Sequence, residues 1–387
     1  MRRITLYLLA LTLVMAGCRE DDVIFIPEQV HVAEPVFSSV RGFYLLNEAN
    51  MSSNKATLDY YDMGTGYYMR NIFGKANPGV PKEMGDVGND IAAYGSHLFC
   101  VINCSNKVDV LDKNTCVKKA QIDIPNCRFI AFSRGYAYVT SYAGPVMFDT
   151  EYKQRGYVAK IDTVTMQVVD TCVVGFQPDG LEIVEDKIYV CNSGGYMFPN
   201  YENTLSVIDI ATFREVERVP IAINLYLCQC DRRGVLWVSS RGDYNWNGTT
   251  GFRSDIYAYD TRKHRIIKAM DCRVSNMWMD GDSLYVVSNE WNNITMSAEK
   301  SFALINTATM QVVDRSFIKD GTDRQIQVPY GIAVDPVSKD IYVTDAKDYV
   351  SPGQLFCYDR YGTRKWEVRT GDIPAHFCFM GDDLNDY

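Results

Sequence analysis

Two nearly identical stretches recur in this chain. IDTVTMQVVDTCVV begins at Ile161, and INTATMQVVDRSFI begins at Ile305. More degraded copies share a short apolar run that ends in Asp or Asn, and these runs end at Asp62, Asp112, Asp162, Asp209, Asp260, Asn306 and Asp359. An internal repeat of this kind restricts the fold to architectures in which one small unit packs against copies of itself.

The repeat unit has the pattern of four short strands. A turn rich in Thr, Gly, Asn, Lys or Arg follows each of the seven acidic or amide residues, and a second β-rich run such as VVDTCVV comes next. Another run precedes them, as in LFCVI at Leu98 and IYVCN at Ile188, usually with a further run and a polar turn before it. Each repeat therefore predicts four strands in about 48 residues. Asp or Asn at the first turn position accepts hydrogen bonds from the following backbone, so we assign these seven residues to hairpins rather than to catalysis.

A four-stranded unit cannot bury both faces of its sheet alone, but radially arranged units bury them against their neighbours. The sequence therefore predicts an all-β fold, a seven-bladed β-propeller over residues 40–387. The first repeat lacks its innermost strand, and the run HFCFMGDD, which begins at His376, has the missing pattern. We expect the C-terminal strand from His376 to Met380 to complete the first blade and close the ring.

The start of the chain has the features of an export signal. Arg2 and Arg3 precede an apolar stretch from Leu6 to Met15, which is shorter than the roughly 20 residues of a membrane-spanning helix. Small residues before Cys18 resemble a bacterial lipobox, which implies a signal peptide over 1–17, lipidation of Cys18 and a tether over 18–39. The REDD that follows resembles the export tag of Bacteroidetes surface lipoproteins, which implies an outer-membrane, lipid-anchored protein facing the cell exterior. A plain signal peptide with an incidental cysteine is the alternative.

Charge and cysteine content exclude other classes. The net charge is −9, and the sequence has no long basic run, so we expect no nucleic-acid partner. The sequence has 12 cysteines, and the 11 other than Cys18 are scattered along predicted strands. It has only four histidines. We therefore interpret Cys228 and Cys230 of the CQC run as buried thiols rather than metal ligands, and we predict no metal or cofactor. Disulfide pairing stays open.

The order of the strands sorts the connections between them. With strands labelled A to D outward from the axis, the A–B and C–D turns emerge on one face, which we call the turn face. The B–C and D–A connections emerge on the opposite face, which we call the loop face. Turn-face connections are short throughout, whereas those of the loop face are expected to be long, irregular and different in every blade. A rigid scaffold commonly presents its binding residues on loops of this kind.

Candidate ligand-binding residues on the loop face are aromatic or amide side chains with few charges. They are Asn47, Asn50, Asp86, Tyr142, Asn192, Tyr196, Tyr226, Arg241, Trp246, Asn289, Trp291, Tyr330 and His376. Aromatic rings stack on a flat ligand while amides bind its polar edge. The asparagines at 47, 192 and 289 follow the second strand of a blade, a position consistent with strand capping and with ligand contact. His376 is the one histidine expected on this face, as an axial contact to a metal-bearing ligand or as a packed imidazole.

The runs LSVIDIATFREV and PYGIAVDPVSKDIYV resemble YVTN or YncE-like propeller repeats, and the likeness extends over most of residues 42–379. A surface lipoprotein of this fold with an aromatic loop face resembles the BtuG group of Bacteroidetes. That resemblance implies a binding protein and not an enzyme. It implies that the loop face captures corrinoids, with cobalamin as transported ligand, and delivers them to a BtuB-type TonB-dependent outer-membrane transporter.

Two other functions are consistent with the sequence. The same face could bind a glycan or a surface protein, with Trp246 and Trp291 as stacking platforms for sugars. A propeller lactonase or lyase would instead need carboxylates or histidines that converge on the axis. Asp86, Asp90, Asp179 and His376 are the candidates for that role, and Asp179, in QPDG, is also explained as a turn residue.

Overall fold

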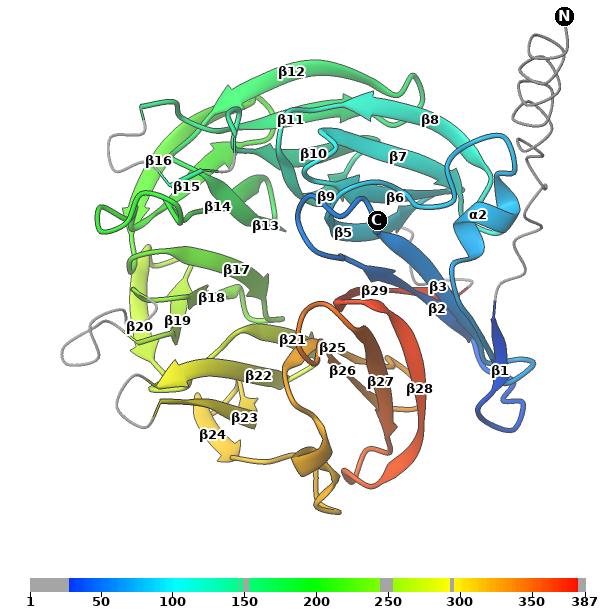
Figure 1. Cartoon of the computed structure of the whole chain (residues 1–387). Coiled ribbons are helices and arrows are strands. Elements are labelled where there is room, and N and C mark those ends of the chain that lie inside the picture. The colour runs from blue at the N-terminus through cyan, green and yellow to red at the C-terminus, as the bar shows by residue number, and fades with distance from the viewer. Residues whose placement is uncertain (1–27, 146, 149–152, 244–252, 293–295, 382–387) are drawn as a thin grey trace, which may run out of the picture.

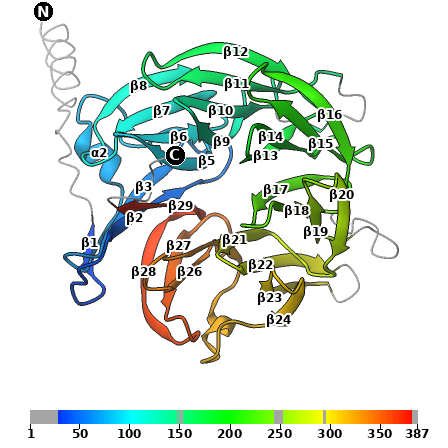
Figure 2. The same cartoon turned by 180° about the vertical axis from the view of Figure 1, so that it is seen from behind.

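Seven antiparallel sheets form a ring around a central axis in the computed structural model of this protein (Figure 1). The structure describes residues 28–145, 147–148, 153–243, 253–292 and 296–381. The view from behind shows the same closed ring (Figure 2). The predicted all-β, seven-bladed β-propeller is confirmed.

The first blade joins the two ends of the domain. From the axis outward its strands are β29 (Pro374–Gly381), β2 (Val40–Asn47), β3 (Thr57–Asp62), β4 (Tyr67–Met69) and β1 (Gln29–His31). In Figure 1 the red β29 lies beside the blue β2, and their antiparallel register pairs Phe379 with Phe43 and Phe377 with Leu45. The C-terminal strand therefore completes the first blade, as predicted, and it begins two residues earlier than expected.

The other six blades have four strands each, in chain order from the axis outward. Blades 2 to 4 contain β5 (Gly88–Tyr94), β6 (His97–Ile102), β7 (Lys107–Asp112), β8 (Lys118–Asp123), β9 (Cys127–Ser133), β10 (Tyr136–Ser141), β11 (Tyr157–Asp162), β12 (Gln167–Val173), β13 (Pro178–Val184), β14 (Lys187–Asn192), β15 (Thr204–Asp209) and β16 (Arg214–Pro220). Blades 5 to 7 contain β17 (Leu225–Cys230), β18 (Val235–Ser240), β19 (Asp255–Asp260), β20 (Arg265–Ala269), β21 (Asn276–Asp280), β22 (Ser283–Asn292), β23 (Ser297–Asn306), β24 (Gln311–Asp314), β25 (Pro329–Val334), β26 (Ile341–Asp345), β27 (Pro352–Tyr358) and β28 (Arg364–Asp372). Two short helices, α2 (Ile72–Ala76) and η1 (Thr322–Gln325), lie in connections.

The repeated Asp or Asn closes the C–D hairpin in every blade. In blade 3, for example, Asp162 Oδ1 accepts hydrogen bonds from the backbone N–H groups of Val164 and Thr165 at 2.9 and 2.8 Å. The corresponding oxygen accepts at least one such bond at Asp62, Asp112, Asp209, Asp260, Asn306 and Asp359. The interpretation of these seven residues as hairpin residues is confirmed.

The hydrophobic core lies between the blades. At the closure, the ring of Phe43 lies 4.7 Å from that of Tyr342 in blade 7 and 5.4 Å from that of Phe377, measured between ring centroids. The 11 cysteines from Cys100 to Cys378 are free thiols, and nine of them are buried. The described residues therefore contain no disulfide, and the core is held by apolar packing.

Two loop-face connections differ from the expected long loops. In blade 2, β6 and β7 are joined by residues 103–106 alone, because Asn106 adopts a left-handed backbone with φ of 56° that closes a tight turn. In blade 6, β22 and β23 stay paired out to Asn292 and Ser297. The segment NEWNNITMSAEKS has no Gly or Pro to interrupt pairing, so most of it is a projecting hairpin rather than an irregular loop.

The folded part of the chain begins before residue 40. Residues 29–31, which fall within the predicted tether, form β1 and pair with β4 at the outer edge of the first blade. Val30 and Val32 pack against the apolar cluster between the first and last blades, and this burial explains why the segment is ordered. No helix among the described residues is long and apolar enough to span a membrane.

Candidate functional site

A cavity of about 280 Å³ opens on the loop face, where blades 5, 6 and 7 meet the closing strand. Six of the 13 predicted residues line it, namely Tyr226, Arg241, Asn289, Trp291, Tyr330 and His376. They come from β17, from the end of β18, from β22, from β25 and from β29. Because the inner strands of neighbouring blades converge at the axis, residues far apart in sequence meet here.

One wall of the cavity is formed by the guanidinium group of Arg241, which stacks on the ring of Tyr226. The guanidinium carbon of Arg241 lies 3.5 Å from the centroid of the Tyr226 ring, and Arg241 Nη1 lies 3.2 Å from Asp179 Oδ2. Burial raises the pKa of Tyr226 to about 12, so this phenol is neutral at physiological pH. The two contacts fix Arg241 in one orientation, with an aromatic face beneath it.

A carboxylate joins the closing strand to the opposite wall. Glu48, which directly follows β2, accepts a hydrogen bond from the hydroxyl of Tyr330 at 2.7 Å through Oε2. Its other oxygen, Oε1, lies 2.8 Å from His376 Nε2. Burial and the Glu48 charge raise the pKa of Tyr330 well above its usual value. The contact with the Glu48 carboxylate therefore positions the His376 ring. The rings of His376 and Phe129 also make an edge-to-face contact, at 6.4 Å between centroids.

The projecting β22–β23 hairpin supplies the exposed rim. Trp291 is 50% exposed although it is one of the largest apolar side chains in the protein. Two residues before it, the carboxamide oxygen of Asn289 is buried and has no hydrogen-bond partner among the described residues. A buried acceptor without a partner is costly, so this oxygen is suited to accept a hydrogen bond from a ligand. The rim therefore pairs a stacking platform with an amide that bonds the Tyr349 side chain and leaves its own oxygen unpartnered among the described residues.

The remaining predicted residues lie elsewhere. Asn47 and Asn192 are fully buried and donate hydrogen bonds to Thr57 and Thr204 of the adjacent strands, so both cap strand ends. The carboxylate of Asp86 accepts the backbone N–H of Ser52 at 2.8 Å. Asn50 donates to the backbone carbonyl of Tyr349. These four positions stabilise loops and strands of the described fold.

Tyr142 and Tyr196 belong to a separate aromatic group over blades 3 and 4. Their rings lie 6.4 Å apart, and Tyr196 also contacts Phe148 at 5.4 Å, measured between centroids. Tyr142 is buried, and its hydroxyl donates to Asp179 Oδ1 at 2.8 Å. Trp246 lies outside the described residues.

Several lining residues were missed by the sequence analysis, namely Glu48, Arg253, Ser254, Val274, Ser275, Asn276 and Glu290. One signal could have found two of them. Asn-Glu occurs at the end of the second strand of blade 1, as Asn47-Glu48, and again in blade 6, as Asn289-Glu290, one residue further along the strand when the blades are aligned on Asp62 and Asn306. In each pair the Glu side chain reaches the cavity. Arg253 and Val274 lie in irregular connections that carry no such pattern.

A narrower cavity of about 180 Å³ continues along the axis below this site. Its lining includes Asp90, Glu182, Gln229 and the far side of His376. Burial raises the pKa of Glu182 to about 8, and a backbone hydrogen bond from Cys230 offsets only part of the shift. No group of three or more His, Cys, Asp or Glu side chains in the described ranges is arranged to hold a metal ion.

The raised pKa of Glu182 predicts a pH-dependent contribution to stability. The folded-state pKa of about 8 lies above the ordinary value of 4.5, so this contribution is fully present below the ordinary value and is lost as pH rises through the folded value. Glu182→Gln, which stays neutral, should therefore gain in melting temperature relative to wild type between about pH 6 and pH 9. Thermal melts at both pH values test this, with the exposed Glu83→Gln as the matched control. A difference that does not change with pH would contradict the assignment.

Comparison with known proteins places the chain by fold and family. Kuenenia stuttgartiensis hydrazine synthase is similar at 16% identity and a TM-score of 0.57, over 75% of this chain and 89% of that chain. The Neurospora crassa Pan2 WD40 domain is similar at 9% identity and a TM-score of 0.51, over 76% and 80%. A chain of a mitotic checkpoint complex is similar at 12% identity and a TM-score of 0.53, over 73% and 80%.

Likeness at such low identity shows the propeller fold alone, and no curated protein sequence matches this one. Residues 41–370 match the family model described as "Domain of unknown function (DUF5074)", and the chain therefore belongs to the DUF5074 family.

Proposed function

We propose that this protein is a cell-surface binding lipoprotein that captures a corrinoid such as cobalamin on its loop face. The observation that carries the proposal is the convergence of six predicted residues on one loop-face cavity that combines an exposed Trp291 with the unpartnered carboxamide oxygen of Asn289. Stacking surfaces beside a few oriented polar groups are typical of sites that bind without chemistry.

The size of the cavity determines how such a ligand would sit. About 280 Å³ lies just below the range of roughly 300–1,000 Å³ for sites that enclose a drug-sized molecule. A corrin is a broad plate fringed with amide side chains, so it would rest across the mouth and place one substituent in the cavity. Trp291 would then cover an apolar face of the plate, while Asn289 and Arg241 would bind amide or carbonyl groups at its edge.

The proposal includes an anchor and a partner. Acylation of Cys18 would hold the protein at the outer membrane, and a TonB-dependent transporter of the BtuB type would receive the ligand from the loop face. Both follow from the resemblance of the signal region and of the propeller to BtuG-type lipoproteins. A glycan-binding propeller is the second candidate, and the half-exposed Trp291 favours it equally.

Retention of colour tests the ligand directly. Purified protein mixed with cobalamin should elute pink from a desalting column, at close to one equivalent by visible absorption. Loss of all colour would contradict corrinoid capture. Retardation on a polysaccharide affinity gel, measured in parallel, would then favour the glycan-binding function.

Trp291→Ala should weaken cobalamin binding by more than about 1 kcal/mol, which is more than fivefold in Kd, because truncation removes the rim's largest stacking surface. Isothermal titration calorimetry measures the change. Phe148→Ala is the matched control, since this ring is also exposed on the loop face but does not line the cavity. Equal losses in both variants, or none in Trp291→Ala, would place the binding surface elsewhere.

A further inference from the structure

Blades 4 and 5 approach each other most closely at a glycine of the inner strand β13. A Cβ atom added at Gly180 would lie 2.6 Å from a carbonyl oxygen of β17 and 3.5 Å from the backbone nitrogen of Cys228. Because Gly180 has no side chain, the backbone of β17 packs directly against β13. Leu181 pairs with Val190 of β14, so Gly180, one residue earlier, lies beside Cys191 on that neighbouring strand.

Two thiols from different blades meet at this point. The side chain of Cys228 is hydrogen-bonded to that of Cys191, and its sulfur also lies 3.9 Å from the carbonyl oxygen of Tyr189, two residues before Cys191. Both side chains are buried, that of Cys191 completely, and both belong to the apolar cluster between blades 4 and 5. Each is a free thiol in the structure. The fold therefore brings two cysteine sulfurs together across a blade interface.

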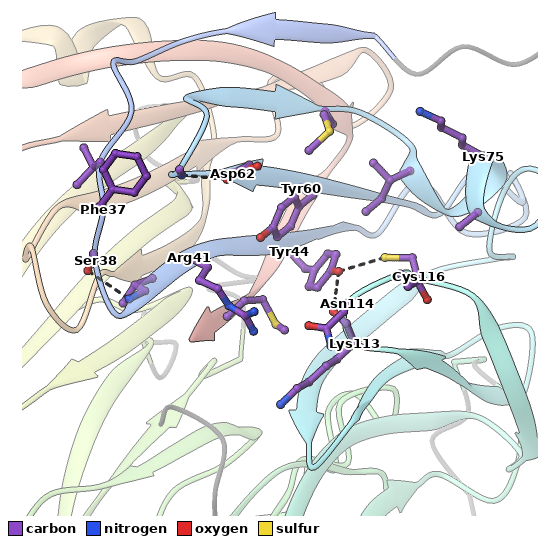
Figure 3. Close-up of a pocket in the computed structure, with 18 residues that line it drawn as sticks. Phe37, Ser38, Arg41, Tyr44, Tyr60, Asp62, Lys75, Lys113, Asn114 and Cys116 are labelled. Carbon is purple, nitrogen blue, oxygen red and sulfur yellow. Dashed lines mark hydrogen bonds between the residues drawn. The ribbon is translucent and has the colours of Figure 1, made fainter. Parts of the chain in front are cut away.

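Other thiols of the described fold have different neighbours. Cys116 lies at a turn-face cavity of about 760 Å³ between blades 1 and 2, where its thiol donates to the Tyr44 hydroxyl at 3.3 Å (Figure 3). Cys230, two residues after Cys228 in β17, is only partly buried, and its thiol lies 3.4 Å from the carbonyl oxygen of Asp231. These two thiols bond to oxygen atoms, so they serve as comparisons for the pair between blades 4 and 5.

We infer that Cys191 and Cys228 form a disulfide that joins blade 4 to blade 5 when the chain folds in the presence of a disulfide oxidant, such as oxidised glutathione or a protein disulfide. The thiolate of one cysteine attacks the oxidant, which forms a mixed disulfide and releases one thiol. The second cysteine then attacks the mixed disulfide and releases the other thiol. The chain loses two protons and two electrons, and the oxidant gains them as it becomes two thiols.

The exchange has to precede the packing of blades 4 and 5. The hydrogen bond with Cys191 and burial raise the pKa of Cys228 well above its usual value. Since the thiolate is the reacting form, the folded and reduced protein should react slowly with the oxidant. Export, which we propose above, would bring the unfolded chain into a compartment where disulfides form. The disulfide would close a loop that contains β15 and β16, and so restrict the unfolded chain.

Oxidative refolding and peptide mass spectrometry test the inference. The full-length protein is unfolded, reduced and refolded with oxidised and reduced glutathione, and its free thiols are then alkylated before digestion with trypsin. Cleavage after Lys and Arg gives the peptides 188–214 and 219–232, which contain Cys191 and Cys228. Most molecules should yield these peptides joined, lighter by two hydrogen atoms than the separate reduced peptides. Folded, reduced protein in the same buffer should form the joined peptide at least about tenfold more slowly.

A matched pair of variants locates the disulfide, because peptide 219–232 also contains Cys230. Cys228→Ala should abolish the joined peptide, whereas Cys230→Ala, in the same strand and the same peptide, should keep it. Circular dichroism establishes that each variant is folded. Refolded wild type without the joined peptide, or joining that persists in Cys228→Ala and is lost in Cys230→Ala, would overturn the inference. Neither Cys191 nor Cys228 lines the loop-face cavity, so these outcomes are independent of the corrinoid proposal.

Discussion

A chain that stops after Ile373, and so lacks β29, should fail to fold into a closed propeller. Strand β29 supplies the innermost strand of the first blade and buries Phe377, Phe379 and Met380. Removing each buried Phe side chain costs about 3–5 kcal/mol. A typical domain is stable by only about 5–15 kcal/mol, so losing the whole strand should remove most or all of the net stability.

Circular dichroism during thermal melting and limited proteolysis measure the loss. The matched control is a chain that stops after Gly381, which keeps every residue of β29. This control should melt cooperatively near the wild-type temperature, whereas the shorter chain should show no cooperative transition and should be digested rapidly. Equal melting temperatures would mean that the ring is stable without its closing strand.

Asp179→Asn should cost about 3–5 kcal/mol of folding stability, because it removes the counter-charge of the mostly buried Arg128 guanidinium. The Asp179 side chain is fully buried, and its Oδ1 lies 2.8 Å from both Arg128 Nε and the Tyr142 hydroxyl. Its Oδ2 lies 3.2 Å from Arg241 Nη1. One carboxylate therefore neutralises two guanidinium groups from different blades.

The midpoint of urea denaturation measures the change, with Asp186→Asn as the matched control. Asp186 pairs with Arg134 on the surface, where both side chains are more than 60% exposed, so its loss should cost about 1 kcal/mol or less. Asp179→Asn should also weaken the cobalamin binding that we propose, since Arg241 loses the contact with Asp179 that positions it over Tyr226. Similar midpoints for both variants would show that the Asp179 cluster contributes no more than a surface pair.

The loop-face site was predictable only in part. Strand alternation correctly assigned Tyr226, Asn289 and Tyr330 to one end of the ring, because successive connections of an antiparallel sheet must alternate between its ends. That rule does not predict how far each side chain lies from the axis of the ring, or which way it turns. Asn47 and Asn192 stand five residues after the residues that pair with Asp62 and Asp209, and both cap strand ends. Asn289 stands six residues after the residue that pairs with Asn306, and it lines the cavity. A shift of one residue along a strand turns the side chain to the opposite face.

Asp179 illustrates a different limit. In sequence, QPDG has the composition of a turn, and a turn residue needs no partner from other blades. In the structure Asp179 lies in β13 and meets Arg128 from β9 and Arg241 from the end of β18. Only the curvature of the ring brings these strands within reach of one another, so no local pattern could reveal the cluster.

The order of amino acids was sufficient to predict the seven repeats, the hairpin role of residues such as Asp162 and Asn306, and the closure of the ring by the run that begins at His376. These features depend on local hydrogen bonding and on an apolar period of two, which are readable along the chain. The folded ring was needed to show that Glu48 joins Tyr330 to His376, and that Asp179 joins Arg128 to Arg241. Such contacts depend on the angle and distance between neighbouring blades, which are set by the packing of side chains across the whole ring.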